Sequence, residues 1–493
     1  MKMPIFFDQS KGVSESVNND NINLLLDSES IQKLYPRICN KGHLHLFPDS
    51  AVFMKDGYPI CTINTIASDI LMSINGTKTV SEVIEEMRVR YSWPTYLSFS
   101  TISAFLSSAK KRGMVTFSKT PTYTVMKISG SRNFFLPYTA SLEITQACDL
   151  KCKYCYANGG LKKDKELSDN QWFSIIDVLS EGTCNISITG GDPLVRPGFV
   201  EIIEYAAKSG LNIKVLTNGM RVDKDVSKRL IETGINMVQI SLDGYDALTH
   251  ESIRGVKGCF EAAVAAISTL AKLGINVIVG MTVTAESVEY VPEVAKLAYE
   301  LGASSLTVGR VLERGRAKGQ NLEISQYNLG QLIFKVDEAA RMFKGKKFAI
   351  AFDESSNWFE TFTEKCPSLD EYILYRSRFH RCAGDNCGAG RLLIAISPSG
   401  EVRPCPVMET SLGLAITGGE LISIMSKFSG LFGRLPTPCK EICCDCKYLF
   451  KCVGCHAEAL EYSYKVPHCN WKENIKREGG NICDIRRNRL NNC

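Results

Sequence analysis

Apolar and polar positions in the middle of the chain follow two alternating periods. Short apolar runs, typical of buried strands, occupy 140–145, 185–189, 213–217, 238–242, 277–283 and 306–311. Stretches with apolar residues at helical spacing separate them, at 168–180, 199–208, 224–233, 260–273 and 291–301. Because strands that alternate with helices pair in parallel, residues 137–350 are predicted to form a parallel sheet. Six such units without further strands predict an α/β partial barrel of the (β/α)6 type rather than a closed barrel of eight.

The N-terminal part has a different pattern. Residues 1–39 are polar and predict a flexible arm. Between 40 and 118, short strand-like runs and helical stretches follow one another at 43–47, 51–55, 65–74, 79–87, 102–111 and 114–117. This order predicts a winged-helix-like domain over 40–118, followed by a linker over 119–136.

The C-terminal part, 351–493, becomes loop-rich and cysteine-rich from about residue 380. Eleven of the 20 cysteines lie between Cys382 and Cys483, and only two precede Cys148. Disulfide frameworks are typical of small secreted chains, so cysteines in this number in a long chain indicate metal binding. Metal crosslinks would supply the stability that a poor apolar core does not.

Composition and charge narrow the classes of function. The chain has 493 residues, 44% of them hydrophobic, and a net charge of +5. It carries no long basic run, so we expect no nucleic-acid partner. No apolar run approaches the ~20 residues that span a bilayer, and the apolar patch at the N-terminus is too short for a signal peptide. We therefore expect a cytoplasmic protein without a membrane partner.

Cys148, Cys152 and Cys155 form a CxxxCxxC motif immediately after the first strand of the predicted sheet. Three thiolates on one tight loop can bind three irons of a [4Fe–4S] cluster, which leaves the fourth iron open to a cofactor or a substrate. A zinc knuckle is the competing interpretation. Structural zinc takes four ligands, however, and no fourth cysteine or histidine follows within the loop.

This motif resembles that of the radical S-adenosylmethionine (SAM) superfamily in its spacing, in its place after the first strand and in the aromatic Tyr154 before the third cysteine. The resemblance implies a TIM-like partial (β/α)6 barrel and a catalytic [4Fe–4S] cluster on Cys148, Cys152 and Cys155. In that family, SAM chelates the open iron through its amino and carboxylate groups. An electron from the cluster then cleaves SAM to a 5′-deoxyadenosyl radical, which abstracts a hydrogen atom from the substrate.

Further residues match the SAM-binding segments of the family, in the family's order along the chain. They are Gly190, Gly191, Asp192, Asn218, Ser241, Asp243 and Arg254. The family usually has Glu where this chain has Asp192. Each segment alone is also typical of a plain βα turn, but together they predict SAM contacts at the C-terminal strand ends, where barrels build their sites. Asp192, Asp243 and Glu143 are carboxylates expected near this site, and none of them is assigned as a general base.

The C-terminal cysteines resemble the SPASM extension, which binds two auxiliary [4Fe–4S] clusters. Cys387, Gly400 and Cys405 give Cx12Gx4C, and four later cysteines give Cx2Cx5Cx2C, whose last gap is usually three in the family. The resemblance assigns Cys387, Cys405 and Cys455 to the first cluster, with Cys382 as a candidate fourth ligand. It assigns Cys443, Cys446, Cys452 and Cys469 to the second, with Cys444 as an alternative to Cys443. A pair of zinc ribbons is the competing interpretation, and Cys483 and Cys493 stay unassigned.

Residues 40–118 resemble the PqqD-like element that recognises ribosomally made peptides, and the resemblance lies in 64–67, 75–80, 105–106 and 111–115. The family binds the leader of its precursor peptide, and an exposed strand edge can accept an extended peptide by strand addition. A DNA-binding winged helix is the competing interpretation. No helix in this region carries a run of Arg or Lys suited to a groove.

Together these parts predict a ribosomal-peptide maturase of the thioether-forming sactipeptide or ranthipeptide type. The resemblance implies SAM, three [4Fe–4S] clusters, a precursor peptide and an external electron donor such as flavodoxin or ferredoxin. Carbon–carbon crosslinking or another peptide oxidation is an alternative reaction. A sulfatase-maturing enzyme is a second alternative, but such enzymes lack the N-terminal domain and have an acidic residue where this chain has Pro406. An iron–sulfur DNA-binding regulator is a third. The sequence does not identify the peptide or the residues that are joined.

Overall fold

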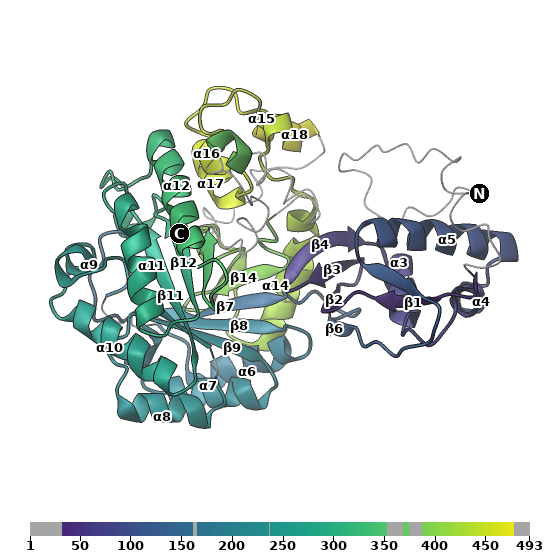
Figure 1. Cartoon of the computed structure of the whole chain (residues 1–493), viewed down its shortest axis with the longest axis horizontal. Helices are drawn as coiled ribbons and strands as arrows, with labels where there is room; N and C mark the ends of the chain where they lie inside the picture. The colour runs from purple at the N-terminus through teal and green to yellow at the C-terminus, as the bar shows by residue number, and fades with distance from the viewer. Residues whose placement is uncertain (1–31, 161–164, 236, 353–367, 374–386, 478–493) are drawn as a thin grey trace. The chain divides into compact units, whose positions relative to one another are not determined.

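The computed structural model describes residues 32–160, 165–235, 237–352, 368–373 and 387–477. The chain divides into two compact units, and the boundary between them falls after Leu136. Cys387 groups with the first unit, and the residues from Gly388 onward belong to the second. Each unit has its own sheet and is described separately (Figure 1).

Among its described residues, the first unit combines a four-stranded sheet, a two-stranded sheet and three helices. Its elements are β1 (Tyr35–Ile38), β2 (Gly42–Leu46), β3 (Ala51–Lys55), β4 (Tyr58–Ile63), α3 (Thr65–Ser73), α4 (Val80–Tyr91), α5 (Thr95–Lys111), β5 (Val115–Ser118) and β6 (Lys127–Gly130). Strands pair in the order β4-β3-β2-β6, and β1 pairs with β5. Apolar side chains such as Phe53, Ile70 and Phe105 are fully buried in its core.

Two features of this unit differ from the sequence prediction. The segment expected to be a linker contains β6, which runs parallel to β2 from the His43–Lys127 pair to the Leu46–Gly130 pair. A second hairpin partner, β4, follows β3. Both strands are short, and the pairing of β6 is with residues some 84 positions earlier in the chain. A local pattern carries no signal for such a contact.

The second unit is built on a ten-stranded sheet in the order β13-β12-β11-β10-β9-β8-β7-β14-β15-β16. All six predicted strands are present and pair in parallel: β7 (Thr139–Thr145), β8 (Asn185–Gly190), β9 (Asn212–Thr217), β10 (Met237–Ser241), β11 (Asn276–Val283) and β12 (Ser305–Arg310). The expectation of six strands without additions was wrong. The parallel strands β13 (Ala349–Phe352) and β14 (Leu393–Ile396) extend both edges, and the antiparallel β15 (Glu401–Arg403) and β16 (Gly413–Leu414) follow β14.

Helices connect these strands and bury one face of the sheet (Figure 1). They are α6 (Asp169–Ser180), η1 (Pro193–Val195), α7 (Phe199–Lys208), α8 (Lys224–Glu232), α9 (Ala247–Arg254), α10 (Cys259–Lys272), η2 (Val288–Tyr290), α11 (Val291–Glu300), η3 (Gly315–Ala317) and α12 (Gln326–Met342). On β11, Val277 and Val279 are buried, while the alternating residues are half-buried or exposed. Neighbouring strands place polar residues on that second face, such as Glu143 beside Thr189. The sheet therefore has one apolar face and one polar face.

The C-terminal segment contains several helices, one of which contacts the end of β12 through charged residues. The helices are α14 (Gly418–Arg434), α15 (Lys440–Cys443), α16 (Leu449–Cys452), α17 (His456–Tyr462) and α18 (Asn470–Arg477). Arg310 at the end of β12 pairs with Glu458 on α17 at 2.6 Å, and both side chains are 8% exposed. Arg314 pairs with Glu461 at 2.9 Å. These ion pairs connect α17 to the end of β12 and to the turn that follows it.

Replacing Glu458 by alanine is expected to destabilise the second unit by about 3–5 kcal/mol, because it leaves the buried Arg310 guanidinium without its carboxylate. Glu232→Ala is the matched control: its ion pair with Lys228 is exposed, and its loss should change stability by less than about 0.5 kcal/mol. Urea unfolding of the metal-free protein measures both. Equal stabilities of the two variants would contradict a structural role for the buried pair.

Candidate active site at the strand ends

The three motif cysteines lie on a loop that begins where β7 ends. Hydrogen bonds close this loop: Cys148 N donates to Gly160 O at 2.8 Å, and Gly160 N donates to Gln146 O at 2.9 Å. Arg316, in the turn after β12, donates its Nε to Cys152 O at 2.9 Å. The backbone N of Arg316 donates to Cys155 O at 3.0 Å. Hydrogen bonds within the protein alone therefore fix the shape of the loop.

Each motif sulfur accepts at least one hydrogen bond from an N–H group. Cys148 Sγ accepts from Leu150 N at 3.4 Å and from Asn218 Nδ2 at 3.7 Å. Cys152 Sγ accepts from Arg254 Nη1 at 3.7 Å. Cys155 Sγ accepts from Gly159 N at 3.3 Å. Donors of this kind stabilise thiolates and cluster sulfurs.

The surroundings of the sulfurs are apolar. Cys148 and Cys155 pack against a buried group formed by Leu150, Cys152 and Cys259. Burial raises the pKa of Cys148 to about 11, which favours the protonated thiol when no metal is bound. A bound metal would offset that cost, because metal ligation deprotonates a thiol. The donor set and its N–H partners thus fit an iron–sulfur cluster. Within the described ranges, no three His, Cys, Asp or Glu side chains are placed to hold a single metal ion.

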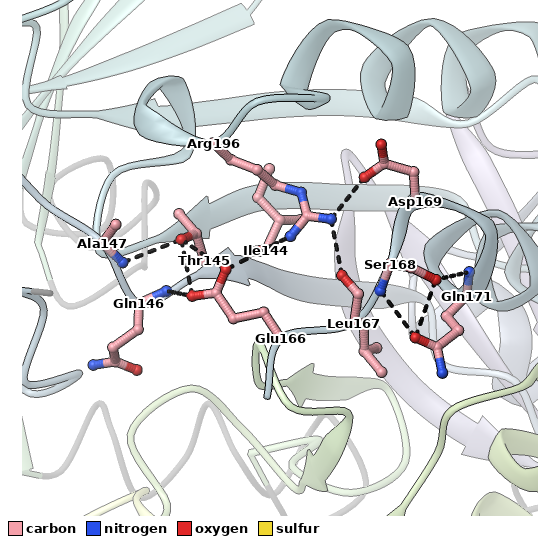
Figure 2. Close-up of polar contacts among 10 residues, drawn as sticks. All are labelled: Ile144, Thr145, Gln146, Ala147, Glu166, Leu167, Ser168, Asp169, Gln171 and Arg196. Atoms are coloured by element: carbon pink, nitrogen blue, oxygen red, sulfur yellow. Dashed lines mark hydrogen bonds and ion pairs between the residues drawn. The ribbon is translucent and has the colours of Figure 1, made fainter. Parts of the chain in front are cut away.

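A buried polar network fixes the start of the loop (Figure 2). Glu166 accepts from Gln146 N at 2.7 Å and from Thr145 Oγ1 at 3.0 Å. Arg196 donates to Ile144 O at 2.8 Å and to Asp169 Oδ1 at 2.6 Å. These contacts hold the end of β7, from which the cysteine loop starts. The sequence analysis did not single out Glu166 or Arg196, since their roles depend on partners 20 to 52 residues away.

The Gly190-Gly191-Asp192 segment packs closely on the same loop. Gly191 N donates to Thr145 O at 2.7 Å, and Asp192 N donates to Ala147 O at 2.8 Å. A Cβ on Gly191 would lie 2.2 Å from Ala147 O, so only glycine fits there. The Asp192 carboxylate is buried and accepts hydrogen bonds from Thr217 Oγ1 and Asn218 N, both at 2.7 Å. Asp192 thus joins the ends of β8 and β9.

Asp192→Asn is expected to remove a pH-dependent part of the stability. Burial raises the pKa of Asp192 from 3.8 to about 6, although three hydrogen bonds favour the ionised form. Because the folded protein binds this proton more tightly than the unfolded chain, protonation of Asp192 stabilises the fold. Its contribution to the free energy of unfolding is about 3 kcal/mol; it is full below about pH 4 and is lost as the pH rises through 6. Urea unfolding of the metal-free protein between pH 4 and 8 should show a steeper loss in the wild type than in the variant. Equal slopes would contradict the shift.

The end of β10 carries a second buried network. Asp243 accepts from Tyr154 Oη and from Arg254 Nε, both at 2.6 Å, and from Thr282 N at 2.9 Å. Its own backbone N donates to His250 Nδ1 at 3.1 Å. Asp243 is fully buried, and Arg254 is 7% exposed. Ser241, at the end of β10, is half-buried on the polar face of the sheet.

Glu143 is also engaged. Its Oε1 lies 2.5 Å from Arg403 Nη2, and Arg403 Nη1 donates to Pro406 O at 2.8 Å. Burial, with the Glu143 carboxylate nearby, raises the pKa of Tyr156, the residue after the third motif cysteine. The ion pair therefore joins β7, from whose end the cysteine loop starts, to the segment that carries Cys405. All three carboxylates expected near the site have charged or hydrogen-bonding partners within the protein.

The C-terminal cysteines gather around the short helices. Cys443 ends α15, Cys452 ends α16, Cys455 precedes α17 and Cys469 precedes α18. Burial, together with Cys469, Cys439 and Cys446 nearby, raises the pKa of Cys443 to about 12. Cys444 is exposed, Cys405 follows β15, and Cys382 lies outside the described residues. Cys387 begins the described C-terminal segment and belongs to the first unit.

The sequence analysis left Cys439 unassigned. It is 8% exposed and lies one helical turn before Cys443, whose N donates to Cys439 O at 2.9 Å. α15 packs against α18, which brings Cys469 to the same region. Cys439, Cys443 and Cys446 repeat the CxxxCxxC spacing of the first motif. That repeat is the signal that identifies Cys439 as a candidate ligand.

Among the described residues, no helix has both the length and the apolar character needed to cross a membrane.

Comparisons with known proteins agree with this site. The Radical SAM superfamily profile matches residues 142–298, which include all three motif cysteines and the ends of β8 to β10. The subtilosin biosynthesis protein AlbA of Bacillus subtilis is 26% identical over 467 residues, covering 91% of this chain and 98% of AlbA. The mycofactocin maturase MftC of Mycobacterium tuberculosis is 30% identical over 332 residues, covering 66% of this chain and 79% of MftC.

The fold also matches a solved structure. Streptococcus suis SuiB bound to S-adenosylmethionine superposes with a TM-score of 0.56 at 15% identity, over 86% of this chain and 96% of SuiB. At that identity the likeness shows the fold, and the match to MftC shows the family. From the cysteine loop, the strand ends and these comparisons together, this chain is an enzyme that belongs to the radical SAM superfamily.

Proposed function

We propose that this enzyme is a peptide maturase that binds a [4Fe–4S] cluster through Cys148, Cys152 and Cys155. The observation that carries the proposal is the set of N–H donors aimed at all three sulfurs on one fixed loop. When bound, the cluster and SAM supply a 5′-deoxyadenosyl radical that abstracts a hydrogen atom from the substrate. Gly190 and Gly191 let the end of β8 pack against the main chain that enters this loop, because a Cβ on either residue would collide with Thr145 O or Ala147 O.

The polar face of the sheet is the surface on which this chain can hold a peptide near the loop. Ser241 and Thr282 lie on this face at the strand ends, and Gln239 lies one pair further in. Hydroxyl and amide groups can hydrogen-bond a peptide backbone without a charged partner. The Glu143 carboxylate on this face is paired with Arg403, so its charge is balanced within the protein.

The first unit supplies a place for the leader of a precursor peptide. In its four-stranded sheet, β6 covers the edge of β2, and the outer edge of β4 has no partner strand among the described residues. Pro59 lies in β4, and proline in a sheet is found at edges. An extended leader could add to this edge by main-chain hydrogen bonds. We assign peptide recognition to residues 40–118, as a PqqD-like element.

The names of the relatives support a peptide substrate: AlbA acts in the biosynthesis of the bacteriocin subtilosin, and MftC is a mycofactocin maturase. We propose a thioether between a cysteine sulfur and a carbon of the same peptide. That reaction removes one hydrogen from the carbon and one from the thiol, with one hydrogen atom passing to the deoxyadenosyl radical. The remaining proton would go to solvent, and cysteines of the SPASM-like segment 351–493 would hold an auxiliary cluster that would supply the acceptor for the remaining electron. A flavodoxin or ferredoxin in the cytoplasm would supply the electron that starts the cycle.

Mass spectrometry of a co-expressed peptide tests the proposal. The substrate would be a small cysteine-containing peptide encoded next to this protein. Thioether formation predicts a loss of two hydrogens per event and cysteines that resist alkylation after reduction. The same loss with alkylatable thiols would favour carbon–carbon crosslinking or another oxidation. An unchanged peptide, with SAM still cleaved, would overturn the peptide assignment.

A further inference from the structure

The end of helix α9 forms backbone hydrogen bonds with the cysteine loop. Lys151 N donates to Arg254 O at 3.2 Å, and Lys153 N donates to Ile253 O at 3.0 Å. These two donors flank the second motif cysteine on either side. The helix then stops at Gly255, whose φ of 76° lies in the left-handed region. The position of Cys152 is thus tied to the last turn of α9.

Side-chain contacts of Arg254 and Tyr154 also connect α9 and the loop near Cys152. Arg254 donates its Nε to Asp243 at 2.6 Å and its Nη1 to Cys152 Sγ at 3.7 Å. Tyr154 donates to the same Asp243 oxygen at 2.6 Å, and its ring lies 5.4 Å from the guanidinium carbon of Arg254. Thr282 N fixes the other oxygen of Asp243 at 2.9 Å. One guanidinium therefore connects the end of β10 to a motif sulfur.

We infer that Asp243 and Arg254 are a positioning pair that acts on Cys152. Two groups of opposite charge, both buried, satisfy each other and hold the half of the loop from Cys152 to Tyr154. Arg254 also places a positive charge beside the Cys152 sulfur. This inference rests on the proposed cluster at the three motif cysteines, and it names a new role for two residues expected to contact SAM.

The pair predicts opposite effects of its two members on the reduction potential of the cluster. Hydrogen bonds and positive charge near cluster sulfurs favour the reduced, more negative state. Arg254→Gln removes that charge, so the midpoint potential should fall. Asp243→Asn keeps Arg254 but removes its counter-charge, so the midpoint potential should rise. If the two residues had a purely structural role, Arg254→Gln and Asp243→Asn would not shift the midpoint potential in opposite directions.

The experiment measures the midpoint potential of the cluster at the three motif cysteines. This cluster is identified by an EPR signal that changes when SAM is added, which separates it from any cluster bound further along the chain. Iron content and the Kd for SAM are measured alongside. Arg221→Gln is the matched control, because Arg221 pairs with Asp149 on the same loop at 2.7 Å but is 50% exposed. Water screens that charge, so the potential should stay at the wild-type value.

Two further variants distinguish a change in the potential from a loss of the folded site. Arg254→Lys keeps the charge and should shift the potential less than Arg254→Gln. Tyr154→Phe keeps the ion pair and removes only the hydroxyl, so it should lower iron content more than it moves the potential. If Arg254→Gln leaves potential and iron content unchanged while the Kd for SAM rises tenfold or more, Arg254 contacts SAM and the inference is wrong. If no SAM-responsive signal forms in the wild type, the proposed cluster itself is wrong.

Discussion

Replacing Cys148, Cys152 and Cys155 together by alanine is expected to abolish cleavage of SAM. The three sulfurs are the donors of the candidate cluster site, and each is matched by an N–H group of the protein. Without them the iron has no anchor, and the N–H donors lose their acceptors. Chromatography of 5′-deoxyadenosine after chemical reduction measures the loss.

Cys259 offers a matched control for this variant. It is fully buried and packs in the same apolar group as Cys152, but it lies on α10 outside the motif. Cys259→Ala should cost about 1 kcal/mol of packing and should keep SAM cleavage. If the triple variant still cleaved SAM, or if Cys259→Ala failed as completely, the assignment of the cluster to the motif loop would not stand.

Gly191→Ala is expected to reduce SAM cleavage about 100-fold, because a displacement of about 1 Å in an active site can cost that much. The added Cβ would lie 2.2 Å from Ala147 O and 2.5 Å from Gln146 O, so one of the two segments must move. Both carbonyls belong to the chain that enters Cys148. The substitution therefore shifts the first motif cysteine without removing any donor atom.

The control for this second variant lies on the same loop. A Cβ on Gly160 would meet no atom within 4 Å, so Gly160→Ala should keep both the fold and the activity. Steady-state rates of 5′-deoxyadenosine formation and iron content are measured for both variants. Wild-type rates in Gly191→Ala would show that the loop tolerates displacement, and an equal defect in Gly160→Ala would show that the loss does not come from the contact with Ala147.

Local patterns were sufficient for the six central strands. Each of β7 to β12 is an apolar run between turn signals, and such runs report burial directly. The helices predicted at 79–87 and 168–180 are present, and both begin with a capping box, at Thr79 and at Ser168. The four-residue strands β6, β13 and β14 were missed. Their place in a sheet is decided by distant partners and not by their own periodicity.

The candidate site was predictable in position but not in detail. Parallel strands bring their C-terminal ends to one edge, so the motif cysteines and the residues after β8, β9 and β10 were expected together. Their mutual contacts were not foreseen. Asp192, Asp243 and Arg254 were expected to face SAM, and the structure pairs them with Asn218, with Tyr154 and with each other. Arg254 lies 11 residues from Asp243 and Tyr154 lies 89 residues from it, on separate elements, so no local pattern reports these contacts.

The placement of β14 beside β7 has a consequence for synthesis of the chain. β14 pairs with a strand that left the ribosome about 250 residues earlier. At about 5–20 residues per second, β7 waits roughly 13–50 seconds for this partner. During that interval one edge of the growing parallel sheet offers unpaired main-chain groups to any other nascent chain. The loop that carries the motif cysteines also starts from this strand, so early loading of iron would take place on a sheet that is still open along one side.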